Sequence, residues 1–87
     1  DDAARRSAKL AVSETVATRF SAVPKELITP FTDCVIDNAS AREIGTLARD
    51  AVIGVTDETA TLVGAVLERP ETQSCVLRAG VNALGTG

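Results

Sequence analysis

The chain has 87 residues, a formal net charge of −3 at pH 7, and no His, Met, Trp or Tyr. General acid–base catalysis near neutral pH draws most often on His, and haem ligation on His, Met, Tyr or a Cys thiolate, so both kinds of chemistry are disfavoured. Nucleic-acid binding is excluded as well, because acidic and basic residues are interspersed and only two aromatic residues could stack on bases.

A chain of this length is expected to form a single domain, 1–87. The apolar fraction is 45% and consists almost entirely of Ala, Val, Leu and Ile. A core of small aliphatic side chains needs close helix contact or a cross-link, because few side chains bury the area that an aromatic ring buries. We expect residues 1–2 and 85–87 to be frayed.

Cys34 and Cys75 are the only thiols of the chain. In an oxidising compartment they predict one disulfide, which closes a loop of about 40 residues and stabilises the fold by on the order of 4 kcal/mol. The chain starts with Asp1 and Asp2, without an initiator Met or a basic and apolar leader, as in an exported protein whose signal peptide has been removed. We therefore expect a periplasmic or extracellular protein. Two buried free thiols in a cytosolic protein are the alternative.

Residues 3–22 are predicted to form a long first helix. Apolar residues recur along it at four-residue spacing: Ala8, Val12, Val16 and Phe20. Pro24 ends or bends this helix, because a proline in a helix interior costs about 3 kcal/mol. Residues 23–29 are then a connector, with room for one helical turn at 25–28.

The second helix is expected to start at Thr29, a hydroxyl N-cap that is followed by Pro30 at the first helical position. It is short and ends near Asn38. Phe31, Cys34 and Val35 share one of its faces. This places the first cysteine on an apolar helix face.

A third helix is predicted from Ser40 onward. Ser40 and Glu43 form a capping box, in which each side chain accepts a hydrogen bond from the backbone N–H of the other residue. The apolar residues behind it have the i, i+3, i+4, i+7 spacing of one helix face: Ile44, Leu47, Ala48 and Ala51. Gly54 is the expected C-terminal stop.

Thr56 or Asp57 is expected to cap a fourth helix that extends to about Glu68. Its inward residues would be Ala60, Val63 and Leu67. Several β-branched residues and one glycine lower the helix propensity of this segment, so a hairpin that pairs 51–55 with 61–66 is the alternative. The helix is preferred because period-two alternation is poor here.

Pro70 opens the last helix, and Gly85 ends it. Its apolar side is expected to carry Cys75, Val76, Ala79 and Leu84. Together these elements predict an all-α fold, a small irregular bundle of four to five short helices stapled by one disulfide.

No catalytic, cofactor or metal site is predicted, because the chain has no nucleophile elbow, phosphate-binding loop or zinc-ligand spacing. Asp33 and Asp37 are interpreted as a solvated acidic face, since calcium needs about six to eight oxygen ligands. Asn38 begins an N-glycosylation sequon, which matters only in a eukaryotic secretory cell. No apolar run reaches the ~18–20 residues that cross a bilayer, so no membrane span is expected.

The chain has more aliphatic residues than single helix stripes absorb: Leu10, Ala17, Val23, Leu27, Ile28, Val52, Ile53, Leu62 and Val81. Six of them are the candidate partner surface: Val23, Leu27, Ile28, Val52, Ile53 and Leu62. Exposed together, they would form an apolar patch of the kind that marks a partner site. The alternative is that the short helices of a small bundle bury wide faces.

These observations favour a small exported, non-enzymatic helical protein that binds another protein, as an accessory subunit or with itself as a small oligomer. A small apolar ligand is a minor variant. In overall plan the chain resembles the periplasmic acid-stress chaperones of enteric bacteria, with which it shares no motif. That resemblance implies the alternative function, a chaperone that exposes apolar surface when its carboxylates are protonated. A hydrolase or redox enzyme is the least favoured class.

Overall fold

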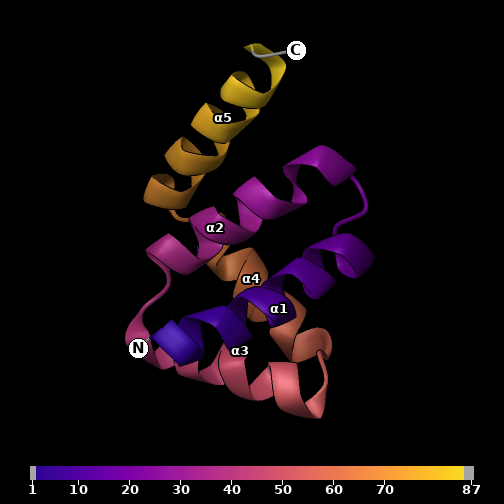
Figure 1. Cartoon of the computed structure of the whole chain (residues 1–87), viewed down its shortest axis with the longest axis vertical. Helices are drawn as coiled ribbons and strands as arrows, with labels where there is room; N and C mark the ends of the chain where they lie inside the picture. Colours follow the sequence, from indigo (N-terminus) through magenta and orange to yellow (C-terminus); the bar gives the residue numbers. More distant parts are fainter. Residues whose placement is uncertain (1, 86–87) are drawn as a thin grey trace.

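The computed structural model describes residues 2–85, and the side chains of 2–82. Five α-helices and one 3-10 turn follow each other along the chain (Figure 1), and no strand occurs in this part of it: α1 (Asp2–Arg19), η1 (Lys25–Leu27), α2 (Ile28–Asn38), α3 (Ala41–Ile53), α4 (Asp57–Leu67) and α5 (Pro70–Gly85). The predicted small all-α bundle is confirmed. Of the ends expected to be frayed, Asp2 and Gly85 are the terminal residues of α1 and α5, and residues 1, 86 and 87 lie outside the described chain.

The hydrophobic core lies between the first four α-helices. Helix α1 packs against α2, α3 and α4, and each of the four helices contributes buried aliphatic side chains: Ala8, Ala11, Val12, Val16, Val35, Ile36, Ile44, Leu47, Val63 and Val66. Ala8 and Ala11 leave room for the helices beside α1 to approach closely, as the small-residue composition predicts. We call residues 2–67, which contain these helices, the body.

The first helix is shorter than predicted, because α1 ends at Arg19 and not near residue 22. The backbone turns at this point, where the N–H of Val23 donates to the carbonyl of Phe20 at 3.0 Å. Pro24 restricts the residue before it to an extended backbone, so the helix has to end several residues earlier. The Phe20 ring lies over Gly64 of α4. A Cβ added to Gly64 would be 3.9 Å from Phe20 Cζ.

The predicted N-cap at Thr29 is wrong. Helix α2 begins at Ile28, its N-cap position is Leu27, and no side chain caps it. The reason is the 3-10 turn η1, in which the N–H of Leu27 donates to the carbonyl of Pro24 at 2.9 Å. Since this turn brings the chain into α2 with helical backbone already formed, Thr29 lies inside the first helical turn. Pro30 is tolerated beside it, because N–H groups of a first turn have no intrahelical partner.

The capping box that opens α3 is confirmed: the N–H of Ser40 donates to Glu43 Oε1 at 2.8 Å, and the N–H of Glu43 donates to Ser40 Oγ at 3.2 Å. The predicted stop is also confirmed, with Gly54 at φ 110°, a backbone that residues with a side chain rarely adopt.

Helix α4 confirms the helical interpretation of its segment, and the hairpin alternative is wrong. Thr56 is the N-cap, and its hydroxyl accepts from the N–H of Thr59. The inward face differs in part from the expected one: its fully buried residues are Thr59, Val63 and Val66, while Ala60 and Leu67 are half-buried. The β-branched residues that lowered the predicted helicity are thus the ones that pack.

Helix α5 is attached to one end of the body (Figure 1). It contacts α2, η1 and α4, and the predicted disulfide Cys34–Cys75 joins it to α2 with the two Cα atoms 5.7 Å apart. On its expected apolar side, Cys75, Val76 and Ala79 are half-buried, and the side chain of Leu84 lies outside the described residues. The C-terminal end of α5 lies at one end of the longest axis of the molecule, whose extents are 37 × 23 × 21 Å.

Candidate functional site

The six residues of the candidate partner surface do not form one exposed surface. Val52 and Ile53, at the end of α3, are 83% and 68% exposed. Val23, Ile28 and Leu62 are partly buried and pack against the core, and Leu27 is half-buried in η1. The connector and the short helices therefore bury wide faces, as the alternative interpretation held.

The exposed large aliphatic side chains of the described residues lie on three helices: Leu10, Val52, Ile53, Leu77 and Val81. Leu10 stands alone on α1. Val52 and Ile53 are consecutive, so they point in different directions from the end of α3. Leu77 and Val81, 69% and 61% exposed, are four residues apart and lie on one side of α5. They are the one pair among the five that shares a helix face.

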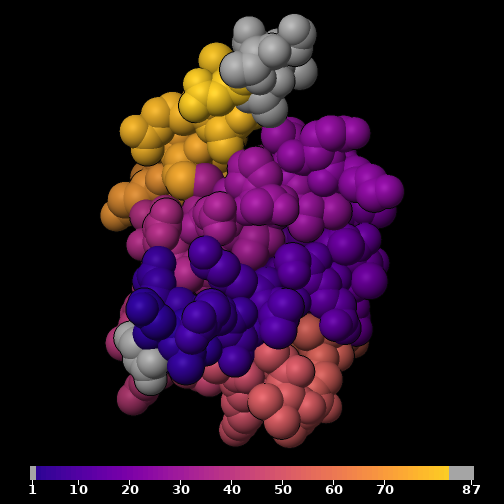
Figure 2. Space-filling model, in the orientation of Figure 1, coloured from indigo at the N-terminus to yellow at the C-terminus, as the bar shows by residue number. Residues whose placement is uncertain are grey.

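This side of α5 faces away from the body. With about 100° of rotation per residue, Leu77 and Val81 lie roughly opposite Thr72 and Ala79, which face α2 and the disulfide. Gln73 and Ser74 lie next to the aliphatic pair and are uncharged and exposed. We call Gln73, Ser74, Leu77 and Val81 the α5 outer face. In Figure 2 the orange and yellow atoms of α5 stand beside the magenta atoms of α2, at one end of the molecule.

The sequence contains a signal for this face, the i, i+4 pair Leu77 and Val81. Of this pair, the predicted surplus of aliphatic residues includes Val81 and misses Leu77. The predicted apolar stripe of this helix, through Cys75, Val76 and Ala79, lies on the opposite side.

The charged side chains form ion pairs between elements. Arg5 pairs with Asp37 at 2.9 Å and Lys9 with Asp33 at 3.3 Å, which joins α1 to α2. The two aspartates of the predicted solvated acidic face are exposed, 50% at Asp33 and 62% at Asp37, and each pairs with a cation of α1. A cation ligand would have to displace Arg5 and Lys9 from these carboxylates.

The best-defined ion pair is a clamp between Arg69 and Glu43. Arg69 binds the Glu43 carboxylate through two nitrogens, at 2.9 and 2.5 Å, and its Nη1 also donates to the carbonyl of Asn38 at 2.9 Å. The hydrogen bond from Arg69, followed by the one from the Ser40 backbone, lowers the pKa of Glu43 to about 2. The same contact raises the pKa of Arg69. The clamp ties the α4–α5 joint to the ends of α2 and α3.

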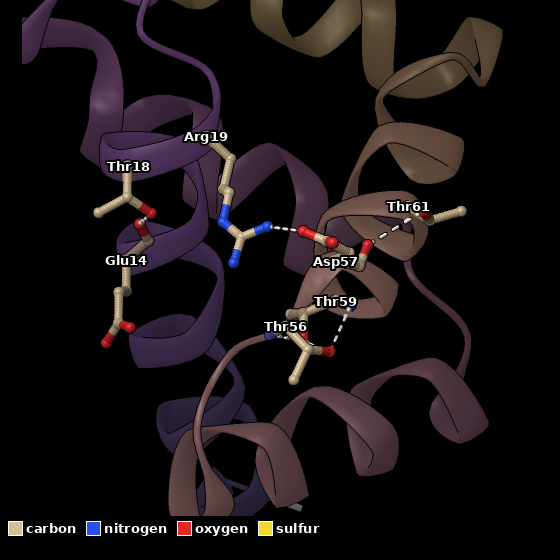
Figure 3. A network of polar contacts seen from close by, with 7 residues as sticks. All are labelled: Glu14, Thr18, Arg19, Thr56, Asp57, Thr59 and Thr61. Atoms are coloured by element: carbon tan, nitrogen blue, oxygen red, sulfur yellow. Dashed lines mark hydrogen bonds and ion pairs between the residues drawn. The ribbon is translucent and has the colours of Figure 1, made fainter.

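A second polar network joins α1 to the start of α4 (Figure 3). Arg19 reaches across to the Asp57 carboxylate. Behind it, the Thr59 hydroxyl accepts from the N–H of Thr56 at 3.0 Å and donates to the buried Asp50 carboxylate at 2.9 Å. These bonds cap α4 and fix the α3–α4 turn. The Thr59 hydroxyl and the Asp50 carboxylate that it bonds are both buried, 1% and 8% exposed, so this pair is out of reach of a substrate and its contact is structural.

Two shallow grooves mark the surface of the described chain. The larger, about 340 Å³, lies between α1 and α3 and is lined by Ala4, Arg5, Ala39, Ala41, Ile44 and Gly45. Its single charged side chain, Arg5, already pairs with Asp37. The smaller groove, about 170 Å³, contains Lys9 and Asp33, which pair with each other. Neither groove gathers the convergent polar groups of a ligand site.

Within residues 2–85 there is no cluster of three or more His, Cys, Asp or Glu that could hold a metal ion. In the same range, no helix combines the length and the hydropathy needed to span a bilayer. Asn38, the sequon residue, is half-buried, and its side-chain amide donates to the carbonyl of Cys34 at 2.9 Å.

Comparison with known proteins gives no relative. No protein-family model matches the chain, and neither the curated proteins nor the solved structures contain a match.

Proposed function

We propose that this protein is an exported, non-enzymatic helical module that binds another protein through the α5 outer face. The observation that supports the proposal is the exposure of Leu77 and Val81, side by side on a helix whose described residues add no side chain to the core cluster. Single exposed aliphatic residues are ordinary on protein surfaces. Two at i, i+4 spacing, with uncharged Gln73 and Ser74 beside Leu77 and the exposed Arg78 beside Val81, are the anchors with which a helix fits an apolar groove of a partner.

The polar side chains support a binding role over catalysis. The chain has no His, and the carboxylates of Asp33, Asp37, Glu43 and Asp57 are each engaged by a cation. A general base has to be within reach of a substrate proton and has a pKa near the working pH. The one strongly shifted carboxyl, Glu43, has its pKa moved away from neutrality.

The disulfide supports the export part of the proposal. Cys34 and Cys75 form a bridge between two helices, and such bridges persist in the periplasm or outside the cell. In the cytosol, glutathione and thioredoxin systems keep most thiols reduced. This chemistry supports a periplasmic or extracellular place.

A site-specific photocrosslinker tests the binding surface. We expect benzoylphenylalanine at position 77 to capture a defined protein, or a second copy of this chain, during native purification. The same group at Leu10 is the matched control, because Leu10 is equally exposed, at 67%, but stands alone on α1. Equal capture at both positions, or none at 77, would refute the α5 outer face as the binding surface.

A second candidate function is the acid-triggered chaperone, which the ion pairs favour. All four of them depend on ionised carboxylates, and protonating all twelve carboxylates would change the net charge from −3 to +9, the number of Lys and Arg residues. Self-repulsion and the lost pairs would then open the bundle. Client protection that starts only below about pH 4, together with acid-induced dye binding, would support this function over the first.

A further inference from the structure

Helix α5 is held by the disulfide more than by the core. The core residues, and the partly buried apolar residues packed against them, all belong to the body. None of them is among residues 70–82, the part of α5 whose side chains are described. The body therefore closes its own core without the last helix, and α5 adds little to the burial that stabilises the fold.

Among its described residues, α5 has one fully buried side chain and no side chain in an ion pair. Thr72, in the first turn, is the one fully buried side chain of α5 among residues 70–82. It is polar, and no group in the described chain forms a hydrogen bond with its Oγ1, which makes its burial unfavourable. The residues that form ion pairs in the described chain are all numbered from 5 to 69. Since α5 begins at Pro70, no side chain of α5 takes part in one of these pairs.

The joint before α5 is bonded on both sides: the N–H of Gln73 in α5 donates to the carbonyl of Arg69 at 2.9 Å, and the other bonds of Arg69 run to the body. Arg69 is held by Glu43 and by the carbonyl of Asn38, and the N–H of Arg69 donates to the carbonyl of Val66 at 3.1 Å. Since all these partners belong to the body, the chain up to residue 69 stays anchored when α5 moves. Residues 69–70 are the natural pivot.

The disulfide can be reached from the α5 side. Cys34 is 3% exposed on α2, whereas Cys75 is half-buried on α5. Access of the attacking thiolate governs the rate of thiol–disulfide exchange. The α5 side of the bridge, which carries the less buried cysteine, is therefore the side from which a reductant approaches.

We propose that a dithiol reductant opens the Cys34–Cys75 bond and thereby releases α5 from a body that stays folded. A reductant thiolate attacks Cys75 Sγ, the S–S bond breaks, and Cys34 leaves as a thiolate that takes up a proton. The second thiol of the reductant then displaces Cys75 from the mixed disulfide. Two electrons and two protons pass from the dithiol, which becomes a disulfide, to the two cysteines.

Release changes which surfaces are accessible. The inner side of α5 around Cys75, Val76 and Ala79 is uncovered, and so is the side of α2 that carries Cys34. The redox state thus controls whether α5 is presented on the body or is free. This device does not depend on the proposed function, because it concerns the hold on α5 and not the partner of its outer face.

Hydrogen–deuterium exchange with mass spectrometry tests the proposal on the full chain. The oxidised protein is compared with protein reduced by dithiothreitol without denaturant and alkylated with iodoacetamide. We expect peptides from residues 70–82 to lose their protection and peptides from α1, α3 and α4 to keep theirs. Retained protection of α5, loss of protection in the body, or a bond that is reduced only in denaturant would each overturn the proposal.

Two further samples separate the release from side effects. The double variant Cys34→Ser/Cys75→Ser should show the exchange pattern of the reduced protein without any reductant, and dithiothreitol should not change it further. Reduced protein that is reoxidised instead of alkylated should recover the protection of α5. A double variant with α5 still protected would contradict the proposal even if alkylation itself disturbs the helix.

Discussion

The body and α5 are both helical, yet they are stabilised by different means. Each helix of the body shares one aliphatic core, and ion pairs and caps fix how the helices meet. Helix α5 has a proline start, a covalent bond at Cys75 and an outer face with two exposed aliphatic side chains. The difference shows that local sequence signals can form a helix whose side chains the hydrophobic core does not include. A cross-link then supplies the attachment that burial does not.

Buried threonines differ in whether their hydroxyl groups are satisfied. Thr59 in the body both accepts and donates hydrogen bonds. Thr72 in α5 is equally buried and has no hydrogen-bond partner for its hydroxyl among the described residues. Thr32 of α2, in the body, is also buried with an unbonded hydroxyl. Whether a buried hydroxyl is satisfied therefore depends on the polar groups within its reach, and not on the region alone.

The largest expected effect comes from removing leucine side chains in the two regions. Leu47→Ala should lower the free energy of unfolding by about 2–5 kcal/mol, because Leu47 is fully buried in the core. Leu77→Ala should change it by less than about 0.5 kcal/mol, as for other exposed positions. Urea unfolding followed by circular dichroism measures both. Similar losses for the two variants would show that α5 is part of the cooperative core.

The threonine pair should give effects of opposite sign. Thr59→Val should cost about 1–3 kcal/mol, because the buried Asp50 carboxylate loses the hydroxyl that donates to it. Thr72→Val should be neutral or stabilising by up to about 1 kcal/mol, because it removes an unsatisfied hydroxyl and keeps the shape. For Thr72→Val, the gain should appear as slower hydrogen exchange in α5. A large loss of stability in this variant would argue for a hidden hydrogen bond to its hydroxyl.

The Arg69–Glu43 clamp should make the stability of the body depend on pH. The pKa of Glu43 is lowered from 4.5 to about 2, so its contribution is fully present above about 4.5 and is lost as the pH falls toward 2. Glu43→Gln should cost about 1 kcal/mol at pH 7, because Arg69 is partly exposed to solvent. The difference from the original protein should vanish near pH 2. Thermal unfolding at several pH values measures this.

Asp37→Asn is the matched control for the clamp. It removes the exposed ion pair with Arg5, and such pairs contribute little. A loss as large as that of Glu43→Gln would mean that surface charge in general, and not the clamp, determines the pH dependence.

The smallest expected effect comes from two helix glycines. An added Cβ at Gly45 of α3 or at Gly80 of α5 meets nothing within 4 Å. Replacing a helix glycine by alanine gains up to about 1 kcal/mol. Gly45→Ala should raise the unfolding free energy of the whole body, whereas Gly80→Ala should raise only the exchange protection of α5. If both variants raised the unfolding midpoint equally, the body and α5 would unfold as one cooperative unit.

Local signals in the sequence were enough where a helix boundary depends on neighbouring residues. The Ser40–Glu43 capping box marks the start of α3 and Gly54 marks its end. Each signal involves only a few consecutive residues, so the sequence pattern predicts both ends of the helix. Thr29 failed because its role depended on the turn before it. The turn η1 led into α2 and made a hydroxyl cap unnecessary.

The candidate surface was less predictable than the fold. Of the six residues of the candidate partner surface, Val52 and Ile53 are exposed, whereas Val23, Ile28 and Leu62 pack on the core. Apolarity alone does not separate these cases, because the same side chain can face a neighbour or solvent. That choice depends on which helices lie next to each other.

The sequence by itself determined the helical class, the caps of α3, the break at Pro24 and the pairing of two cysteines, because each depends on local backbone chemistry or on there being one pair of thiols. Only the tertiary structure decided that four helices close the core and that α5 stands outside it with Leu77 and Val81 exposed. The physical reason is that burial is a property of the assembled elements. A helix carries apolar residues on two sides, and its neighbours determine which side is covered.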